Sequence, residues 1–287
     1  MTRKIIDLAK RTQRIYAGNE MAVYSGYATL YILMAMIPLL TLVIGLVNLV
    51  PTVDLENLRS VVQELLPDVP QVQTMFDTVI ANVNRRAGTL AVSVSVIASL
   101  WSASAGVAAI QAGLQKISGT GGSFLRKRGA ALLYTLLFVL LIPALLVFRV
   151  LRGSIETLIA SLNKALNIPD IASWLLRFME YSGLITVAAM VLVILLTYTF
   201  LQGERRRLRL QLPGAVFTTV LWLVFSAFFA IFITRFWKAS SLYGSLAAIF
   251  LAAMWLKSIT MILFYGAALN EALLEQRAGK EKELATI

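Results

Sequence analysis

The sequence predicts an all-α protein that crosses a membrane several times, and three observations support this fold class. Of 287 residues, 59% are hydrophobic and 14% are charged, whereas soluble domains carry about 25% charged residues. The mean hydropathy is +0.78. The last apolar run, residues 242–270, is 29 residues long with Lys257 as its sole charge, which is long enough to cross a bilayer as a tilted helix.

We expect a single membrane domain over residues 1–287, with a basic arm at 1–20, a bundle at 22–270 and a polar tail at 271–287. The arm has the apolar spacing of an amphipathic helix lying at the membrane surface. Similar spacing predicts amphipathic helices in the outer loops, within 51–88 and 155–169. Six transmembrane helices are expected at roughly 22–50, 89–112, 129–151, 175–201, 213–236 and 242–270.

Three prolines mark features of these helices. Pro38 and Pro143 lie near the middle of the first and third spans, where a missing hydrogen bond and a steric clash predict a kink. Pro213 is expected to open the fifth span, because a proline is tolerated in the first turn of a helix.

The basic residues predict the orientation. The net charge is +11. Of the 26 Lys and Arg residues, 16 fall on one side of the predicted membrane, in the arm, the loop at 114–128, the loop at 204–209 and the tail. The opposite side carries 9. The positive-inside rule therefore predicts a multi-pass membrane protein with both termini in the cytoplasm. It also explains the charge without nucleic acid, so the expected partners are membrane lipids, anionic lipids included.

The side chains that are missing exclude most enzymatic chemistry. The chain has no cysteine and no histidine, which removes thiol nucleophiles, Ser–His systems and Cys/His zinc sites. None of the 15 carboxylates falls at the centre of a predicted span, where cation-coupled transporters often place them. We expect no enzyme activity, no cofactor and no metal.

Lys257 is the most distinctive site candidate. A lysine at the centre of a spanning helix costs about 3 kcal/mol on insertion scales, so a carboxylate such as Glu180, hydroxyl groups, water or an anionic ligand must compensate. Either it faces a functional cavity or it joins a structural network. The candidate cavity and substrate residues are Lys257, Trp255, Met261, Tyr27, Tyr31, Pro38, Ser99 and Ser102.

The second predicted span carries a seam of small residues on one helix face. Such a seam lets backbones approach closely, and it indicates either a tightly packed bundle centre or a groove left open for a substrate. The seam residues are Ser95, Ser99, Ser102, Gly106, Ala109 and Gly113.

The run YGSLAAIFLAAMWLKSITMILFYGAALNEAL closes the bundle, and AMIPLL, FLRKRG and LPGAV precede it in order. These motifs resemble the BrkB/YihY-type family of bacterial inner-membrane proteins over roughly residues 15–275. Lys257 stands where that family usually has a neutral residue. The signature residues are Tyr243, Gly244, Ser245, Trp255, Gly266, Ala267 and Asn270.

The resemblance implies a six-helix plasma-membrane protein linked to serum resistance, hence to virulence, and in one branch to export of a lipid A precursor. An older name for the family is ribonuclease BN. The function predicted here is translocation of a lipid or another amphiphilic, anionic substrate through an intramembrane cavity. A non-transporting envelope scaffold is the alternative, and a ribonuclease is the remote one, because no residue set supports RNA cleavage.

Overall fold

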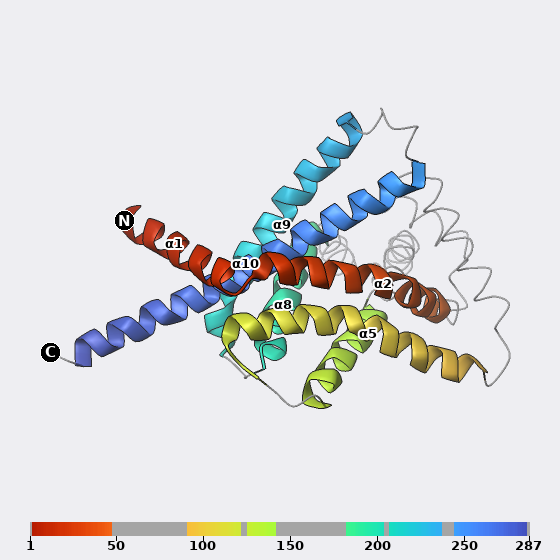
Figure 1. The fold of residues 1–287 in the computed structure, drawn as a ribbon, viewed down its shortest axis with the longest axis horizontal. Helices are drawn as coiled ribbons and strands as arrows, with labels where there is room; N and C mark the ends of the chain where they lie inside the picture. The colour runs from red at the N-terminus through yellow and green to blue at the C-terminus, as the bar shows by residue number, and fades with distance from the viewer. Residues whose placement is uncertain are drawn as a thin grey trace, which may run out of the picture. The chain divides into compact units, whose positions relative to one another are not determined.

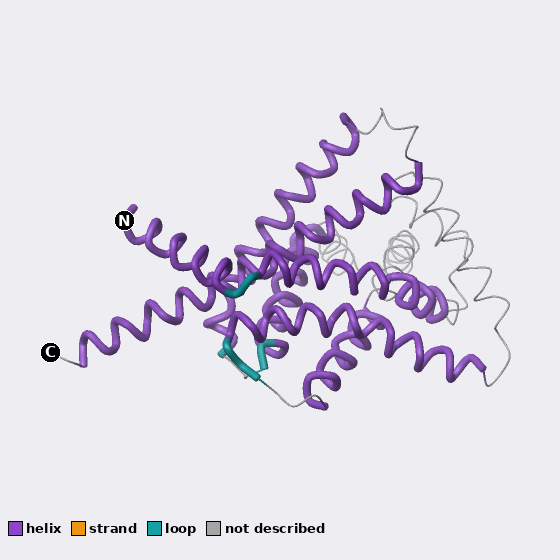
Figure 2. The backbone as a smooth tube through the Cα atoms, viewed as in Figure 1, coloured by secondary structure: helices purple, strands orange, loops and turns teal. Residues whose placement is uncertain are grey.

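The computed structural model describes residues 2–47, 91–121, 125–141, 182–203, 207–236 and 244–285. Nearly all of these residues lie in helices, a few lie in turns, and none of them lies in a strand (Figure 2). The predicted all-α fold class is confirmed for this part of the chain. The predicted outer amphipathic helices within 51–88 and 155–169, together with Pro143 and Tyr243, lie outside the described residues.

Each of the six predicted spans overlaps a helix. Among the described residues, three helical stretches are long and apolar enough to cross a membrane, namely Ile97–Ser118, Leu208–Ile233 and Ile249–Ala278, while Met21–Met36 and Thr186–Leu201 are shorter apolar helices. The count of six spans thus stays a prediction. The helices are α1 (Thr2–Gly18), α2 (Met21–Val47), α5 (Ala91–Ser118), α8 (Ser182–Leu201), α9 (Leu208–Phe236) and α10 (Gly244–Ala285) (Figure 1); residues 125–141 are also helical.

Three helix boundaries differ from the sequence predictions. The helix α10 continues to Ala285, because the Ala, Leu, Glu, Gln, Arg and Lys residues after Asn270 are strong helix formers. The helix α5 runs to Ser118 instead of ending near 112. The prediction that Pro213 opens its helix was wrong: α9 begins at Leu208, and Pro213 removes only one backbone hydrogen bond close to the helix start.

The turn between α1 and α2 is short and held by the backbone. Glu20 has a φ of 58°, and the Asn19 Nδ2 donates a hydrogen bond of 2.9 Å to the Ile15 carbonyl, which caps the end of α1. The predicted amphipathic helix in the arm is therefore present as α1. Its placement on a membrane surface stays a prediction.

The chain divides into two compact units. The first contains residues 1–35, 103–134 and 189–287, and the second contains residues 36–102 and 135–188. The first unit holds most of the described residues and all the inter-helix contacts discussed below. The predicted single membrane domain stays a prediction.

Two glycines set how closely α9 and α10 approach in the first unit. A Cβ atom on Gly266 would collide with the Thr218 and Tyr198 hydroxyl oxygens, and one on Gly214 would collide with the Gly266 carbonyl oxygen and Asn270. Only glycine fits at these two positions without moving a neighbouring helix. This is the small-residue packing that brings membrane helices into backbone contact.

The helix α5 uses the C-terminal half of the predicted seam in the same way. We call this end of the first unit, where α5 and α8 end and α9 begins, its inner end. The ring of Phe264 lies where a Cβ of Gly113 would be, and a Cβ on Gly106 would lie 3.3 Å from the Cα of Ile32 in α2. Gly106, Ala109 and Gly113 are buried, whereas Ser99 is half-buried and Ser102 is exposed. The seam is thus a packing surface at its inner end and is open at Ser102.

Replacing Gly266 with alanine should destabilise the protein, because the added methyl group has no space between α9, α8 and α10. We expect Gly266→Ala to lower the free energy of unfolding by about 1–3 kcal/mol. The matched control is Gly26→Ala in α2, where no atom lies within 4 Å of the added Cβ and alanine favours the helix by about 1 kcal/mol. Thermal unfolding in one detergent compares the two variants, and equal melting temperatures would contradict the packing described here.

Candidate functional site

Lys257 lies in the apolar part of α10, thirteen residues after Gly244 and eight residues after Ile249, where the stretch that is long and apolar enough to cross a membrane begins. Its side chain is exposed. No cluster of three or more His, Cys, Asp or Glu side chains occurs among the described residues. The ammonium group is thus an exposed positive charge in an apolar stretch of helix.

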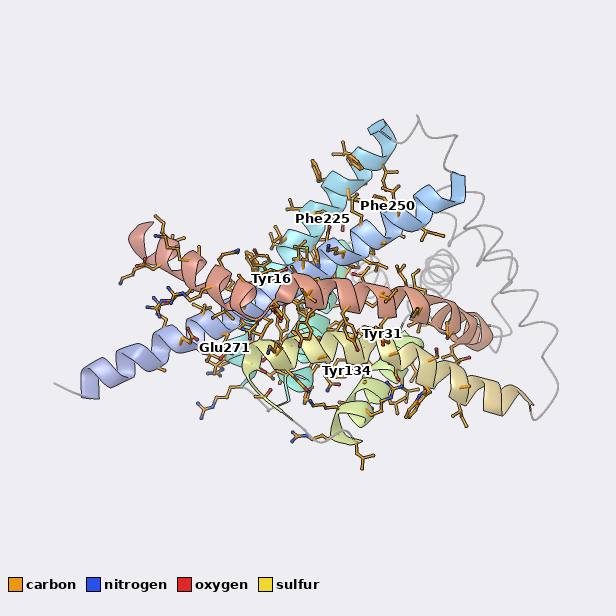
Figure 3. The ribbon with its side chains drawn as sticks, viewed as in Figure 1. Tyr16, Tyr31, Tyr134, Phe225, Phe250 and Glu271 are labelled. Carbon is orange, nitrogen blue, oxygen red and sulfur yellow. The ribbon has the colours of Figure 1, made fainter. Side chains whose placement is uncertain are left out.

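The face of α10 that carries Lys257 is packed against other helices at one end and exposed at the other. Phe250, Lys257 and Phe264 are spaced by seven residues, which places them on one face two turns apart. Phe264 is 0% exposed against α5, whereas Phe250 is 68% exposed. Figure 3 labels Phe250 and Glu271 toward opposite ends of this stretch of α10. The face is therefore packed at its inner end and open from Lys257 outward.

The other predicted cavity residues are distributed over several surfaces. Trp255 and Met261 are half-buried on α10. Tyr27 is exposed on α2, and its ring centroid lies 4.7 Å from that of the half-buried Tyr31. Pro38 lies inside α2 and is half-buried. Pro38, Ser99 and Ser102 belong to the second unit. Among these residues the structure brings Tyr27 and Tyr31 together, and the cavity itself stays a prediction.

The side chain of Tyr198 links three helices inside the first unit. It is 0% exposed. Its hydroxyl donates to the Leu263 carbonyl of α10 at 2.6 Å and lies 2.7 Å from the Thr218 hydroxyl of α9. These bonds lie directly beside Gly266, which leaves the space for the phenol. A buried phenol with both partners satisfied holds helices together and offers no group for chemistry.

Asn270 clamps the start of α9 onto α10. Its Oδ1 accepts a 2.7 Å hydrogen bond from the Gly214 N–H, and its Nδ2 donates to the Gln211 carbonyl at 3.1 Å and to Gln211 Oε1 at 2.8 Å. The LPGAV motif and the Gly266–Asn270 end of the last motif thus meet in space. Of the signature residues, Gly266 and Asn270 therefore serve helix packing.

The end of α8 is capped by side chains from other helices. Gln115 Nε2 donates to the Leu201 carbonyl at 3.4 Å, Ser118 Oγ donates to the Gln202 carbonyl at 3.0 Å, and Arg126 Nη2 donates to the Gly203 carbonyl at 3.0 Å. Thr120 Oγ1 also donates to the Gln202 carbonyl. These donors satisfy carbonyls that have no partner within the helix, and Arg126 complements the negative end of its dipole.

Several buried amide atoms near this inner end have no hydrogen-bond partner. They are Gln115 Oε1, Gln202 Oε1 and Gln211 Nε2. Gln202 is 1% exposed and Gln211 is 0% exposed. Each unpaired buried donor or acceptor costs about 1–3 kcal/mol. These three amide groups are therefore buried polar groups for which the described residues supply no partner.

The helix α1 is attached to α10 by an aromatic contact. The rings of Tyr16 and Tyr265 stack with centroids 3.9 Å apart at 12°, and the Tyr265 hydroxyl donates to Gln13 Oε1 at 2.6 Å. Burial raises the pKa of the Tyr16 hydroxyl above its usual value, so this phenol stays neutral at physiological pH. Figure 3 labels Tyr16 where α1 meets α10.

Sequence reasoning did not single out Tyr198, Thr218, Gln202 or Gln211. The available signal was their polarity within apolar stretches, TYTFLQ at the end of α8 and QLPGAVFTT at the start of α9. Polar side chains that face lipid are costly, so such residues are expected to turn toward other helices. Which helix each one meets depends on contacts between segments that are far apart in sequence.

Removing the Tyr198 hydroxyl should weaken the contact between α8, α9 and α10. Tyr198→Phe keeps the ring but leaves the Thr218 hydroxyl without this partner, and we expect a loss of about 1–2 kcal/mol in the free energy of unfolding. Tyr24→Phe, at a half-buried position on α2, is the control and should change stability little. If both variants melt at the wild-type temperature, the hydrogen bonds of Tyr198 do not hold these helices.

Comparisons with known proteins agree with the predicted resemblance. The family described as virulence factor BrkB matches residues 13–286. A relative from Bacillus subtilis (strain 168), the ribonuclease-like protein YfkH, is 25% identical over 265 residues, which are 91% of this chain and 93% of the relative. No solved structure matches the chain. Because the family match spans nearly the whole sequence, the chain belongs to the family of the virulence factor BrkB.

Proposed function

We propose that this membrane protein translocates a lipid or another amphiphilic, anionic substrate, with Lys257 as the group that attracts its charged part. The observation that carries this proposal is the exposed side chain of Lys257 within the apolar stretch Ile249–Ala278 of α10. A charge at this depth needs an opposite charge, hydroxyl groups or water around it. An anionic head group that reaches Lys257 would supply the opposite charge.

The apolar residues near Lys257 suit an amphiphilic substrate. Phe250 lies two turns away on the same face and is 68% exposed, and Met254 and Met261 are half-buried on the neighbouring positions of α10. A hydrocarbon chain can pack against such side chains while its head group contacts the ammonium. A small hydrophilic anion would gain nothing from this apolar surface.

The proposed topology has six spans in the bacterial inner membrane, with both termini in the cytoplasm. Exposed basic side chains support it, because they lie along α1, at the end of α5, at the start of the 125–141 helix and at the start of α9, as the positive-inside rule expects for a cytoplasmic side. They are Lys4, Lys10, Arg11, Arg14, Lys116, Arg126, Arg207 and Arg209.

We also propose that the protein is not an enzyme. The name of the Bacillus relative refers to a ribonuclease, but the chain has no histidine or cysteine, and its carboxylates form no cluster among the described residues. Metal-dependent and His-dependent RNA cleavage both need such groups. Purified protein should therefore leave RNA intact, and cleavage that persists after contaminants are removed would contradict this part of the proposal.

Replacing Lys257 should reduce transport without unfolding the protein. In liposomes, we expect Lys257→Leu to lower the transfer rate of a fluorescent anionic lipid by about tenfold, which corresponds to about 1.4 kcal/mol of lost attraction, and to leave the melting temperature unchanged or higher. Lys257→Arg keeps the charge and should retain most of the activity. Lys116→Leu is the matched control, because Lys116 is an exposed lysine near the inner end of α5.

Two results would contradict the proposal. Equal transfer by wild type and Lys257→Leu would remove Lys257 from the mechanism. No transfer by wild type, together with stoichiometric protein partners that co-purify from the membrane, would favour the envelope scaffold instead.

A further inference from the structure

An exposed arginine at the inner end of the first unit is fixed by a contact between two segments. Arg126 lies near the start of the 125–141 helix and is exposed. Its Nη2 donates a 3.0 Å hydrogen bond to the carbonyl of Gly203, which follows the end of α8. A guanidinium carries five N–H groups in a rigid fork, so a bond made by one of them orients the others. Arg126 is therefore a positioned cation at the surface.

The chain brings two more exposed arginines to the same end. Arg207 follows Gly203 by four residues, which span at most about 14 Å, and Arg209 lies in the first turn of α9. Both side chains are exposed. The start of α9 is held on α10, because the Asn270 Nδ2 donates to the carbonyl and to Oε1 of Gln211. Three exposed arginines from two helical segments thus lie near the turn that follows α8.

Arg209 stands at the inner end of an exposed apolar face of α9. Three, seven, eleven and fourteen residues after it come four apolar side chains, and these spacings keep to one face of a helix. They are Leu212, Val216, Val220 and Leu223, and they are 44%, 44%, 55% and 42% exposed. We call these four residues the α9 stripe. A positive charge therefore stands at the end of a hydrocarbon surface.

The local charge favours an anionic ligand. The segment 203–209 contains four arginines and one acidic residue, Glu204. Residues 125–129, which include Arg126, add three basic residues and no acidic one. Guanidinium groups bind phosphate oxygens through paired N–H donors. A phosphate group whose charge is not balanced by a cation of its own therefore complements this end of the unit best.

We propose that Arg126, Arg207 and Arg209 bind the phosphate of an anionic phospholipid, and that an acyl chain of this lipid packs along the α9 stripe. Under the proposed topology, the lipid belongs to the cytoplasmic leaflet. An inorganic phosphate ion carries the same kind of charge but would gain nothing from the apolar stripe. Lys257 lies thirteen residues before Asn270 on α10, about 20 Å along the helix, so the two sites are separate and this one does not depend on transport.

The test is a thermal-shift titration of the full-length protein in a neutral detergent. Because the three arginines are exposed, a lipid bound there exchanges with detergent and has to be added back. The Lys257→Leu variant serves as the background, so that binding at Lys257 does not contribute. We expect dioctanoyl phosphatidylglycerol, an anionic phospholipid, to raise the melting temperature by about 3 °C near saturation, and the zwitterionic dioctanoyl phosphatidylcholine to raise it by less than about 1 °C. High salt should reduce the shift, because exposed charges are screened.

Substitutions in the same background locate the site. Arg126→Gln and Arg209→Gln should each raise the apparent dissociation constant of dioctanoyl phosphatidylglycerol by about fivefold. Arg126→Gln also removes the bond to Gly203, so each shift is measured from the melting temperature of that variant without lipid. Arg11→Gln is the matched control, because Arg11 is an exposed arginine on α1, outside the site, and it should bind the lipid as the background does.

Four results would overturn the inference. No shift with the anionic lipid, or an equal shift with the zwitterionic one, would mean that the arginines bind no anionic head group. Equal weakening by Arg11→Gln would mean that diffuse positive charge attracts the lipid. An equal shift with inorganic phosphate at the same concentration would assign the site to a free ion.

The fourth result separates this site from the proposed function. A shift that occurs in wild type and disappears in Lys257→Leu would remove the arginine site and leave the proposed function standing. A shift that persists in Lys257→Leu and weakens in the Arg126 and Arg209 variants, with no lipid transfer by wild type, would support the arginine site and contradict the proposed function.

Discussion

The close approach of α9 and α10 at Gly214 and Gly266 is the constraint on which the first unit depends. No side chain fits between these helices at that level, so their backbones are near enough for Asn270 to reach the Gly214 N–H and for Tyr198 to reach the Leu263 carbonyl. Lipid supplies no hydrophobic force between helices. Close packing and buried hydrogen bonds must therefore provide the specificity of the association.

The close approach of α9 and α10 also determines which stretch of α10 is exposed. With its inner end held by α9, α1 and α5, the helix has a packed stretch around Phe264 and an exposed stretch around Lys257 and Phe250. The position of the ammonium is thus a consequence of packing two turns away. A charge on a mobile loop would reorient freely, whereas this one is held at a fixed position along a helix.

Much of this organisation follows from the sequence, and some of it does not. The length and apolarity of the runs predicted the helices. Helical spacing predicted one seam of small residues from Ser95 to Gly113, of which Gly106, Ala109 and Gly113 are buried and Ser102 is exposed. Lys257 was identified because a charge is rare in such a run. The sequence alone could not pair Asn270 with Gly214 or Tyr198 with Thr218, because these contacts join helices whose relative rotation depends on the whole bundle. The boundary at Pro213 was misplaced because the Leu, Arg and Gln residues before it, 208–212, are also good helix formers.

Native mass spectrometry of the gently solubilised full-length protein tests the central claim most directly, because it detects a bound lipid without assuming transport. Wild type and Lys257→Leu would be purified side by side from the same membranes. The account predicts that wild type retains an anionic lipid and that the Lys257→Leu variant loses it. The same anionic lipid on both proteins, or a lipid-free wild type, would contradict the account and show that Lys257 does not bind a head group.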